Sequence, residues 1–267
     1  SEFSVYGIVN GQAVAGTTAG AALALGNAIR VSANLDGTDG FRYDVRSSGY
    51  LSDGGTADRR LTDAYDSMYE LRVNNQSFSS VPAALAELDR RQFALGPQAA
   101  GTLLTTRKIY VPAEGGFARY LEIVTNPSGI AQRARVRVEG DLGSDGSTRI
   151  VVAPSATGNT YAVTVENRSG SSDPALAHVF AGAGAVAVAP SSVAFADGND
   201  EVHYEWETTV PAGGTVIFMH FAIQREPTDS TGADAAAVAL VNLTDARALT
   251  GLTAAEKAAI KNFVVPQ

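Results

Sequence analysis

The densest group of polar and aromatic side chains in the sequence precedes residue 70, where Asp63, Tyr65, Asp66 and Tyr69 stand close together. Sugar-binding sites combine such groups, because aromatic rings stack on sugar faces and carboxylates accept hydroxyl protons. We therefore take Tyr65 and Asp66 as candidate ligand-binding residues. The alternative, which the spacing favours, is a loop that enters a strand and buries Tyr69 in the core.

Three further candidates for a ligand site are Arg107, Arg119 and His178. In a carbohydrate-active enzyme they would share a cleft with Tyr65 and Asp66. A cleft that joins a histidine or tyrosine to an arginine and a carboxylate within hydrogen-bond reach would indicate catalysis. A binding module or a structural spacer would lack that arrangement.

The sequence contains three histidines, His178, His203 and His220, and their spacing matches neither a zinc-protease helix nor a compact metal cluster. His220 stands in an apolar run, which predicts a core histidine with satisfied hydrogen bonds. His203 alternates with Glu205 and Glu207, so we expect an exposed ion-pair partner. His178 lies where a loop enters a strand, and we expect it to be the freest of the three.

Several kinds of chemistry are excluded or disfavoured by the residues present. There is no cysteine, which excludes disulfides, thiolate metal sites and a cysteine nucleophile, and no Gly-x-Ser-x-Gly elbow. Residues 182–187 formally match a dinucleotide fingerprint, but Pro190 follows at once and no strand-helix alternation surrounds them. We expect no cofactor. Six aspartates in glycine-rich turns leave calcium open, although Asx turns without metal are favoured; they are Asp36, Asp39, Asp53, Asp58, Asp141 and Asp145.

Composition and charge narrow the class of partner. The net charge is -8 and the basic residues are scattered, which disfavours nucleic acid and anionic membranes as partners. No apolar run is long enough to span a bilayer, and we expect no signal peptide before Phe3. Low lysine content, acidic charge and abundant Gly, Asn, Asp and Thr favour an exported bacterial protein, so we expect an extracellular or cell-surface location.

The elements that would position these residues are predicted to be mostly strands. The 27 glycines separate short apolar runs, and alternation of apolar and polar residues predicts strands at 41–45, 69–73, 148–153, 160–166 and 202–209. Residues 215–223 are apolar on both faces, which predicts a central strand covered on both sides and hence a third layer. We expect one short helix at 82–91, where Pro82 suits the first helical position.

The C-terminal part changes character. Residues 233–243 predict a helix, and Thr253 with Glu256 forms a capping-box pattern before residues 257–263. With no internal repeat or linker in view, we predict one continuous domain over residues 1–267. Its fold class is mainly β, an antiparallel multi-sheet sandwich with a helical tail at about 233–263.

The clearest predicted supersecondary unit is a hairpin of residues 117–125 and 131–139, joined by a turn at Asn126–Gly129. One face of its second strand carries Arg133, Arg135 and Arg137. Such a ladder could hold an anionic ligand. A solvated strand face with cross-strand ion pairs is the favoured interpretation.

A resemblance to a known family rests on three stretches, residues 106–112, 117–127 and 140–145, in which strands lead into Thr-Asn and Gly-Asp turns. Over roughly residues 63–263 the chain resembles galactose mutarotase-like β-supersandwich domains of large bacterial secreted and cell-surface proteins. The resemblance implies stacked antiparallel sheets, and sugar handling is common among such folds. The histidine motifs that supply the mutarotase acid and base have no match here, so no catalytic role is carried over.

These observations lead to two functional hypotheses. The first is a non-catalytic extracellular binding or adhesion module that contacts glycan or another extracellular polymer, accessory to other domains of a longer chain. The alternative is a carbohydrate-active enzyme, lyase or epimerase-like, on a supersandwich fold. A purely structural spacer is a third interpretation.

Overall fold

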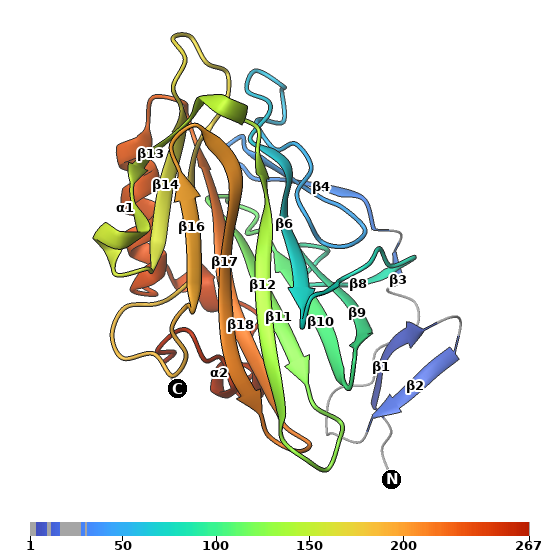
Figure 1. Cartoon of the computed structure of the whole chain (residues 1–267). Helices are drawn as coiled ribbons and strands as arrows, with labels where there is room; N and C mark the ends of the chain where they lie inside the picture. Colours follow the sequence, from blue (N-terminus) through green and yellow to red (C-terminus); the bar gives the residue numbers. More distant parts are fainter. Residues whose placement is uncertain (1–3, 10–11, 17–27, 30, 267) are drawn as a thin grey trace.

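A computed structural model describes residues 4–9, 12–16, 28–29 and 31–266 of the chain (Figure 1). Two large antiparallel sheets dominate it. The mainly β fold class predicted from glycine spacing and alternation is confirmed, and the α-helices lie in the C-terminal part.

The larger sheet has nine strands, and every neighbouring pair in it is antiparallel. In spatial order they are β13 (Thr148–Val152), β14 (Tyr161–Glu166), β15 (Ala175–Val179), β18 (Thr215–Arg225), β11 (Ala118–Thr125), β10 (Leu103–Tyr110), β9 (Gln92–Ala100), β8 (Ala84–Glu87) and β3 (Ala28–Ile29).

The smaller sheet has five antiparallel strands, which lie in front of the larger sheet in Figure 1. Their order is β16 (Ser192–Ala196), β17 (Asn199–Val210), β12 (Gln132–Leu142), β6 (Tyr65–Val73) and β7 (Gln76–Ser77). Two hairpins complete the strands, β1 (Ser4–Val9) with β2 (Gln12–Gly16) and β4 (Ala33–Asp36) with β5 (Arg42–Val45).

Strand β18 decides the layering, because both of its faces are buried. Val216, Phe218 and Ala222 belong to the core between the two sheets. Met219 and Phe221 belong to a second core, on the opposite face of the nine-stranded sheet, which the C-terminal segment covers. The predicted third layer is therefore confirmed.

The C-terminal segment contains α1 (Ser230–Val241), a 3-10 turn η4 (Ala246–Leu249) and α2 (Ala254–Ala259). Helix α1 packs on β14, β15 and β18. The predicted capping box is confirmed: Thr253 Oγ1 accepts from the Glu256 backbone N–H at 3.1 Å, and the Glu256 carboxylate accepts from the Thr253 N–H at 2.8 Å. None of the described helices is both long and apolar enough to cross a membrane.

The predicted hairpin of residues 117–125 and 131–139 is wrong. Strand β11 pairs with β10 and β18 in the larger sheet, whereas β12 pairs with β17 and β6 in the smaller one. The turn at Asn126–Gly129 therefore carries the chain from one sheet to the other. The Asn126 side chain stabilises this crossing, because its Nδ2 donates to the carbonyls of Ile130 at 2.7 Å and Val210 at 3.1 Å.

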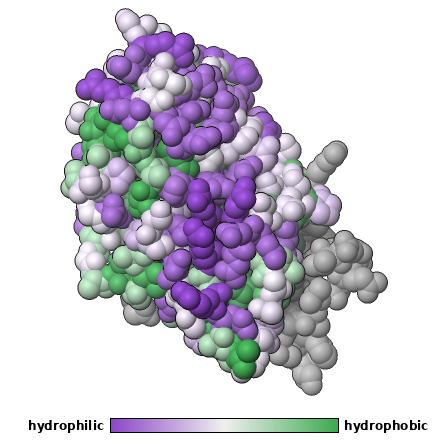
Figure 2. Space-filling model, viewed as in Figure 1, coloured by the Kyte–Doolittle hydropathy of each residue, from purple (hydrophilic) through white to green (hydrophobic). Residues whose placement is uncertain are grey.

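The ladder of arginines on β12 faces outward. Its cross-strand partners come from β17 and not from β11, whereas Arg137 pairs with Glu139 of β12 itself. Arg135 Nε lies 2.6 Å from Glu205 Oε2, and Arg133 Nη2 lies 3.7 Å from Glu207 Oε2. Figure 2 shows the hydrophilic band that runs over this face of the five-stranded sheet. The favoured interpretation, a solvated face with cross-strand ion pairs, is confirmed.

The predicted helix at 82–91 is also wrong. Ala84–Glu87 forms β8, which pairs with β9, and the chain then turns through Leu88, Asp89 and Arg90 with φ values of 51°, 52° and 65°. Three successive left-handed residues cannot continue a right-handed helix. The sheet contacts of β8 outweigh the helical propensity of its alanines.

Candidate functional site

A fully buried ion pair lies at the centre of the nine-stranded sheet, on the face that meets the smaller sheet. Arg107 on β10 and Glu122 on β11 are paired across the strands and both have no exposed surface. Arg107 Nη2 lies 2.7 Å from Glu122 Oε1 and its Nε lies 3.0 Å from Oε2. His220 on β18 joins them, with Nε2 at 2.9 Å from Glu122 Oε1.

The smaller sheet closes this cluster with two tyrosines. Tyr204 Oη lies 2.8 Å from His220 Nδ1, and Tyr69 Oη lies 2.8 Å from His178 Nδ1. Tyr69 also accepts at its carbonyl from Arg107 Nη2 at 2.9 Å, and it has a φ of 70°, which is uncommon for an aromatic residue. The contacts of the Tyr69 hydroxyl and of its carbonyl thus hold a strained backbone conformation in place.

The charges in this cluster compensate one another. Burial alone would raise the pKa of Glu122, but the charge of Arg107 and the hydrogen bonds from His220 and Arg107 outweigh it, so the pKa is lowered. Burial lowers the pKa of His220 despite its bond to Glu122, and burial lowers the pKa of His178 to about 3. One cation therefore faces one anion, and both imidazoles are neutral near pH 7.

The residue types that would indicate catalysis thus lie close together, but they do not line a cleft. Histidine, tyrosine, arginine and carboxylate lie within hydrogen-bond reach, yet His220, Glu122 and Arg107 are all fully buried and bonded to one another. A general acid or base must reach a substrate to transfer a proton. In this conformation the cluster stabilises the junction of the two sheets.

The five candidate residues from the sequence fall in three places. Tyr65, Arg107 and His178 lie together in the core between the sheets. Asp66 is exposed, one residue along β6 from the buried Tyr65. Arg119 is buried on the opposite face of the nine-stranded sheet, so it cannot share a cleft with the others.

Arg119 secures the C-terminal segment to the sheet. Its Nη1 donates to the carbonyls of Ala248 at 2.8 Å and Thr250 at 2.9 Å, and its Nη2 donates to Gln92 Oε1 at 2.7 Å. The guanidinium lies 4.8 Å from the centre of the Tyr110 ring. Burial lowers the pKa of Arg119 to about 10, so it stays charged at neutral pH.

Of the three predictions about the histidines, one is confirmed and two are wrong. The prediction that His220 is a satisfied core residue is confirmed. The expectation that His178 is the freest is wrong, because the strand it enters, β15, is covered on both faces. His203 is half-buried, with Nε2 at 3.2 Å from Ser192 Oγ, and is not an exposed ion-pair partner.

Two of the aspartates in glycine-rich turns make local backbone contacts. Asp39 accepts from the Phe41 N–H at 3.2 Å and Asp58 from the Arg60 N–H at 3.0 Å, which is the geometry of Asx turns. Across the residues that the structure describes, no group of three or more histidine, aspartate or glutamate side chains is placed to hold a metal ion.

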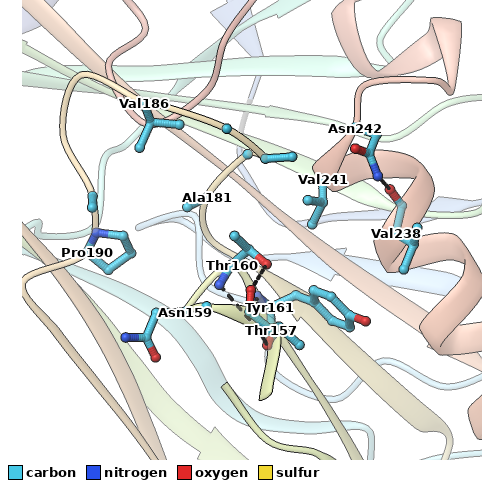
Figure 3. Close-up of a pocket in the computed structure, with 15 residues that line it drawn as sticks. Thr157, Asn159, Thr160, Tyr161, Ala181, Val186, Pro190, Val238, Val241 and Asn242 are labelled. Atoms are coloured by element: carbon cyan, nitrogen blue, oxygen red, sulfur yellow. Dashed lines mark hydrogen bonds between the residues drawn. The ribbon is translucent and has the colours of Figure 1, made fainter. Parts of the chain in front are cut away.

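One concave feature of the described surface is a pocket of about 490 Å³ between α1, the turn η3 (Pro154–Thr157) and the loop 181–190 (Figure 3). Figure 3 shows Tyr161 and Thr157 on one wall, with Val238 and Val241 of α1 and the following residue Asn242 beside them. The full lining comprises Thr157, Gly158, Asn159, Thr160, Tyr161, Ala181, Gly182, Ala183, Gly184, Val186, Ala189, Pro190, Val238, Val241 and Asn242.

The lining combines polar and apolar side chains and carries no charge. None of the fifteen residues is an aspartate, glutamate, histidine, lysine or arginine. The polar groups are hydroxyls and carboxamides, and Asn242 Nδ2 is engaged with the Val238 carbonyl at 2.8 Å. The Asn159 side chain is exposed and hydrogen-bonds to none of the described residues.

Tyr161 supplies the aromatic ring of the pocket, and its orientation is fixed. Its Oη donates to Asp234 Oδ1 of α1 at 2.7 Å. Burial, together with this bond and the nearby charge of Asp234, raises the pKa of Tyr161 to about 12. The ring is therefore a neutral phenol at physiological pH, locked between β14 and α1.

Sequence reasoning did not find this pocket. Residues 182–187 open no helix, as a dinucleotide fingerprint would, since 181–190 forms no helix or strand. The other walls come from segments about 20 residues before and 50 residues after that segment. Only the fold brings them together, and no local pattern marks such a site.

Comparisons with known proteins identify no family. No family model and no curated protein matches the sequence. Solved structures with similar folds include a candidate aldose 1-epimerase from Klebsiella pneumoniae, at 8% identity and a TM-score of 0.47, covering 76% of this chain and 82% of that chain.

Two polysaccharide-degrading enzymes are also among the similar structures. One is a polysaccharide lyase, at 10% identity and a TM-score of 0.41, covering 71% of this chain and 32% of that chain. The other is a heparan sulfate lyase from Pedobacter heparinus, at 11% identity and a TM-score of 0.39, covering 70% of this chain and 30% of that chain. The chain spans about a third of the length of either lyase. None of the three similarities identifies an activity.

Proposed function

We propose that this chain is a non-catalytic glycan-binding module and that its ligand site is the pocket between α1, η3 and the loop 181–190. The observation that carries the proposal is the lining of that pocket: hydroxyls, carboxamides, small apolar side chains and one fixed aromatic ring, without an acid-base pair. These groups suit the hydroxyls and C–H faces of a sugar.

The size of the pocket is consistent with a small ligand. Ligand sites are typically clefts of roughly 300–1,000 Å³ with a few polar groups placed among apolar ones. At about 490 Å³ the pocket falls within that range. One or two sugar units of a longer chain would occupy it.

The absence of an acid-base pair from the lining separates binding from catalysis. Glycosidic bond cleavage uses carboxylates or other titratable groups that reach the scissile bond. Asp234, a carboxylate that contacts the lining, is engaged with Tyr161. The alternative, a carbohydrate-active enzyme, would require the buried cluster around Glu122 and His220 to open to solvent.

The test is a glycan array probed with the purified chain, with and without calcium, followed by titration calorimetry on the strongest ligand. Asn159→Ala removes one carboxamide and should weaken binding about three- to tenfold, the loss expected for one hydrogen bond. Tyr161→Ala removes the ring and should weaken it further. Asp66→Ala, an exposed carboxylate outside the pocket, is the matched control and should bind like the parent.

The opposing outcomes are distinct. If no glycan binds, or if the pocket variants bind as well as the parent, the proposal fails. If Asp66→Ala alone abolishes binding, the site is the segment around Asp66 on β6 that the sequence suggested. Chromatography of the bound glycan after long incubation distinguishes a binding module from an enzyme, because shorter products released from the glycan would favour the enzyme.

We further propose that the chain forms one domain and acts outside the cell, alongside other domains of a longer protein. The support is compositional: no cysteine, a net charge of -8 and no linker-like tract. Limited proteolysis tests the first part, because one domain should yield one stable core. Two separately stable fragments would contradict it.

A further inference from the structure

We infer that the pocket selects uncharged sugars and rejects glycans that carry carboxylate or sulfate groups. This inference rests on the proposed glycan-binding function and adds the chemical class of the ligand. It comes from the charges in and around the pocket and from the hydrogen-bonding character of its polar groups.

An anionic ligand would find no cationic partner in the pocket. None of the fifteen lining residues is basic. A carboxylate or sulfate that leaves water needs a cation or several strong donors to replace its hydration. Binding an anionic sugar here would therefore cost desolvation without a compensating ion pair.

The charge beside the pocket has the wrong sign for an anion. Asp234 of α1 contacts Tyr161, with its Oδ1 2.7 Å from the Tyr161 hydroxyl. The protein as a whole carries a net charge of -8. Both the local and the overall field therefore repel an anionic ligand.

The lining does suit neutral hydroxyl groups. The Asn159 carboxamide both donates and accepts, as a sugar hydroxyl does, and it is not engaged with any described residue. Val186, Val238 and Pro190 provide apolar surface for the C–H face of a sugar ring. The site therefore offers a neutral sugar both a hydrogen-bonding group and apolar surface.

Val238 offers a way to reverse the selectivity. It lines the pocket, lies on α1 and is 42% exposed, so a longer side chain can be placed there. Val238→Lys adds a cation at the rim. Ser77→Lys is the matched control, because it adds the same charge at an exposed position of β7, outside the pocket.

The probe is the strongest neutral polysaccharide found on the array, before and after oxidation of its primary hydroxyls to carboxylates. The parent should bind the oxidised form at least about tenfold more weakly than the neutral form. Val238→Lys should reduce that ratio to less than about threefold, and Ser77→Lys should leave it as in the parent.

The outcomes separate this inference from the proposed function. Equal or tighter binding of the oxidised form by the parent overturns the selectivity and leaves glycan binding intact. Val238→Lys behaving like Ser77→Lys would also overturn it. If Val238→Lys does not fold, Asn242→Lys places the cation at the same rim, at the C-terminal end of α1, where a positive charge is favoured. No binding of any glycan refutes the proposed function itself.

Discussion

The buried pair of Arg107 and Glu122 allows a quantitative prediction about stability. Glu122→Gln keeps the shape of the side chain but removes its charge, which leaves Arg107 as an uncompensated cation with no exposed surface. Removing one partner of a buried ion pair costs about 3–5 kcal/mol. The carboxamide also offers one acceptor oxygen where the carboxylate offers two, so the contacts from Arg107 and His220 can no longer all be made.

The assay is urea denaturation followed by the fluorescence of Trp206, the single tryptophan, which is fully buried and stacked on Phe218 at 4.9 Å. The control is Glu207→Gln, which removes an exposed carboxylate from β17 and should change the free energy of unfolding by less than about 1 kcal/mol.

Two results would refute this reasoning. A Glu122→Gln loss no larger than the Glu207→Gln loss would mean that the pair is not buried as described. A double replacement, Arg107→Met with Glu122→Leu, should recover much of the loss, because it removes both charges at once. If the double variant is less stable than the single one, desolvation of Arg107 is not the cause.

Three further predictions concern other contacts. Burial and the neighbouring Glu166 raise the pKa of Asp173 to about 7. The carboxyl of Asp173 therefore binds its proton more tightly in the folded state than in the unfolded state. The free energy of unfolding should fall as pH rises from about 4 to about 7. Thermal unfolding across that range should show a flatter slope for Asp173→Asn, and an unchanged slope would contradict the assignment. Tyr69→Phe leaves His178 Nδ1 without its partner and should cost about 1–3 kcal/mol by urea denaturation; a loss near zero would mean that water replaces the hydroxyl. Thr253→Ala removes the capping box of α2 and should cost about 1 kcal/mol, whereas Ala258→Ser at an exposed position of the same helix should cost less.

Local patterns predicted the features that depend on neighbours in the chain. Alternation identified β5, β6, β13, β14 and β17, because side chains on a strand point to opposite sides with a period of two. The unbroken apolar run at 215–223 predicted burial on both faces, and the pattern of Thr253 and Glu256 predicted the helix start. Each of these signals is contained within a few residues.

The pairing of strands was decided by tertiary structure. Residues 117–125 and 131–139 have the pattern of a hairpin, yet β11 and β12 belong to different sheets. Alternation fixes which side chains face the core but not which strand lies alongside, because any strand with a matching apolar face can provide the same burial. Residues 82–91 show the same limit, since pairing of β8 with β9 overrides helical propensity.

The candidate site residues also show what the sequence determines and what the tertiary structure decides. The sequence indicated that Tyr65, Arg107 and His178 carry useful chemistry, and the fold brings them together. Whether such a group is a site or part of the core depends on what covers it, and here the smaller sheet covers it completely. The sequence alone determined residue types, charge and strand faces. The tertiary structure decided which polar groups are sealed and which line a pocket, because burial is set by contacts between segments far apart in the chain.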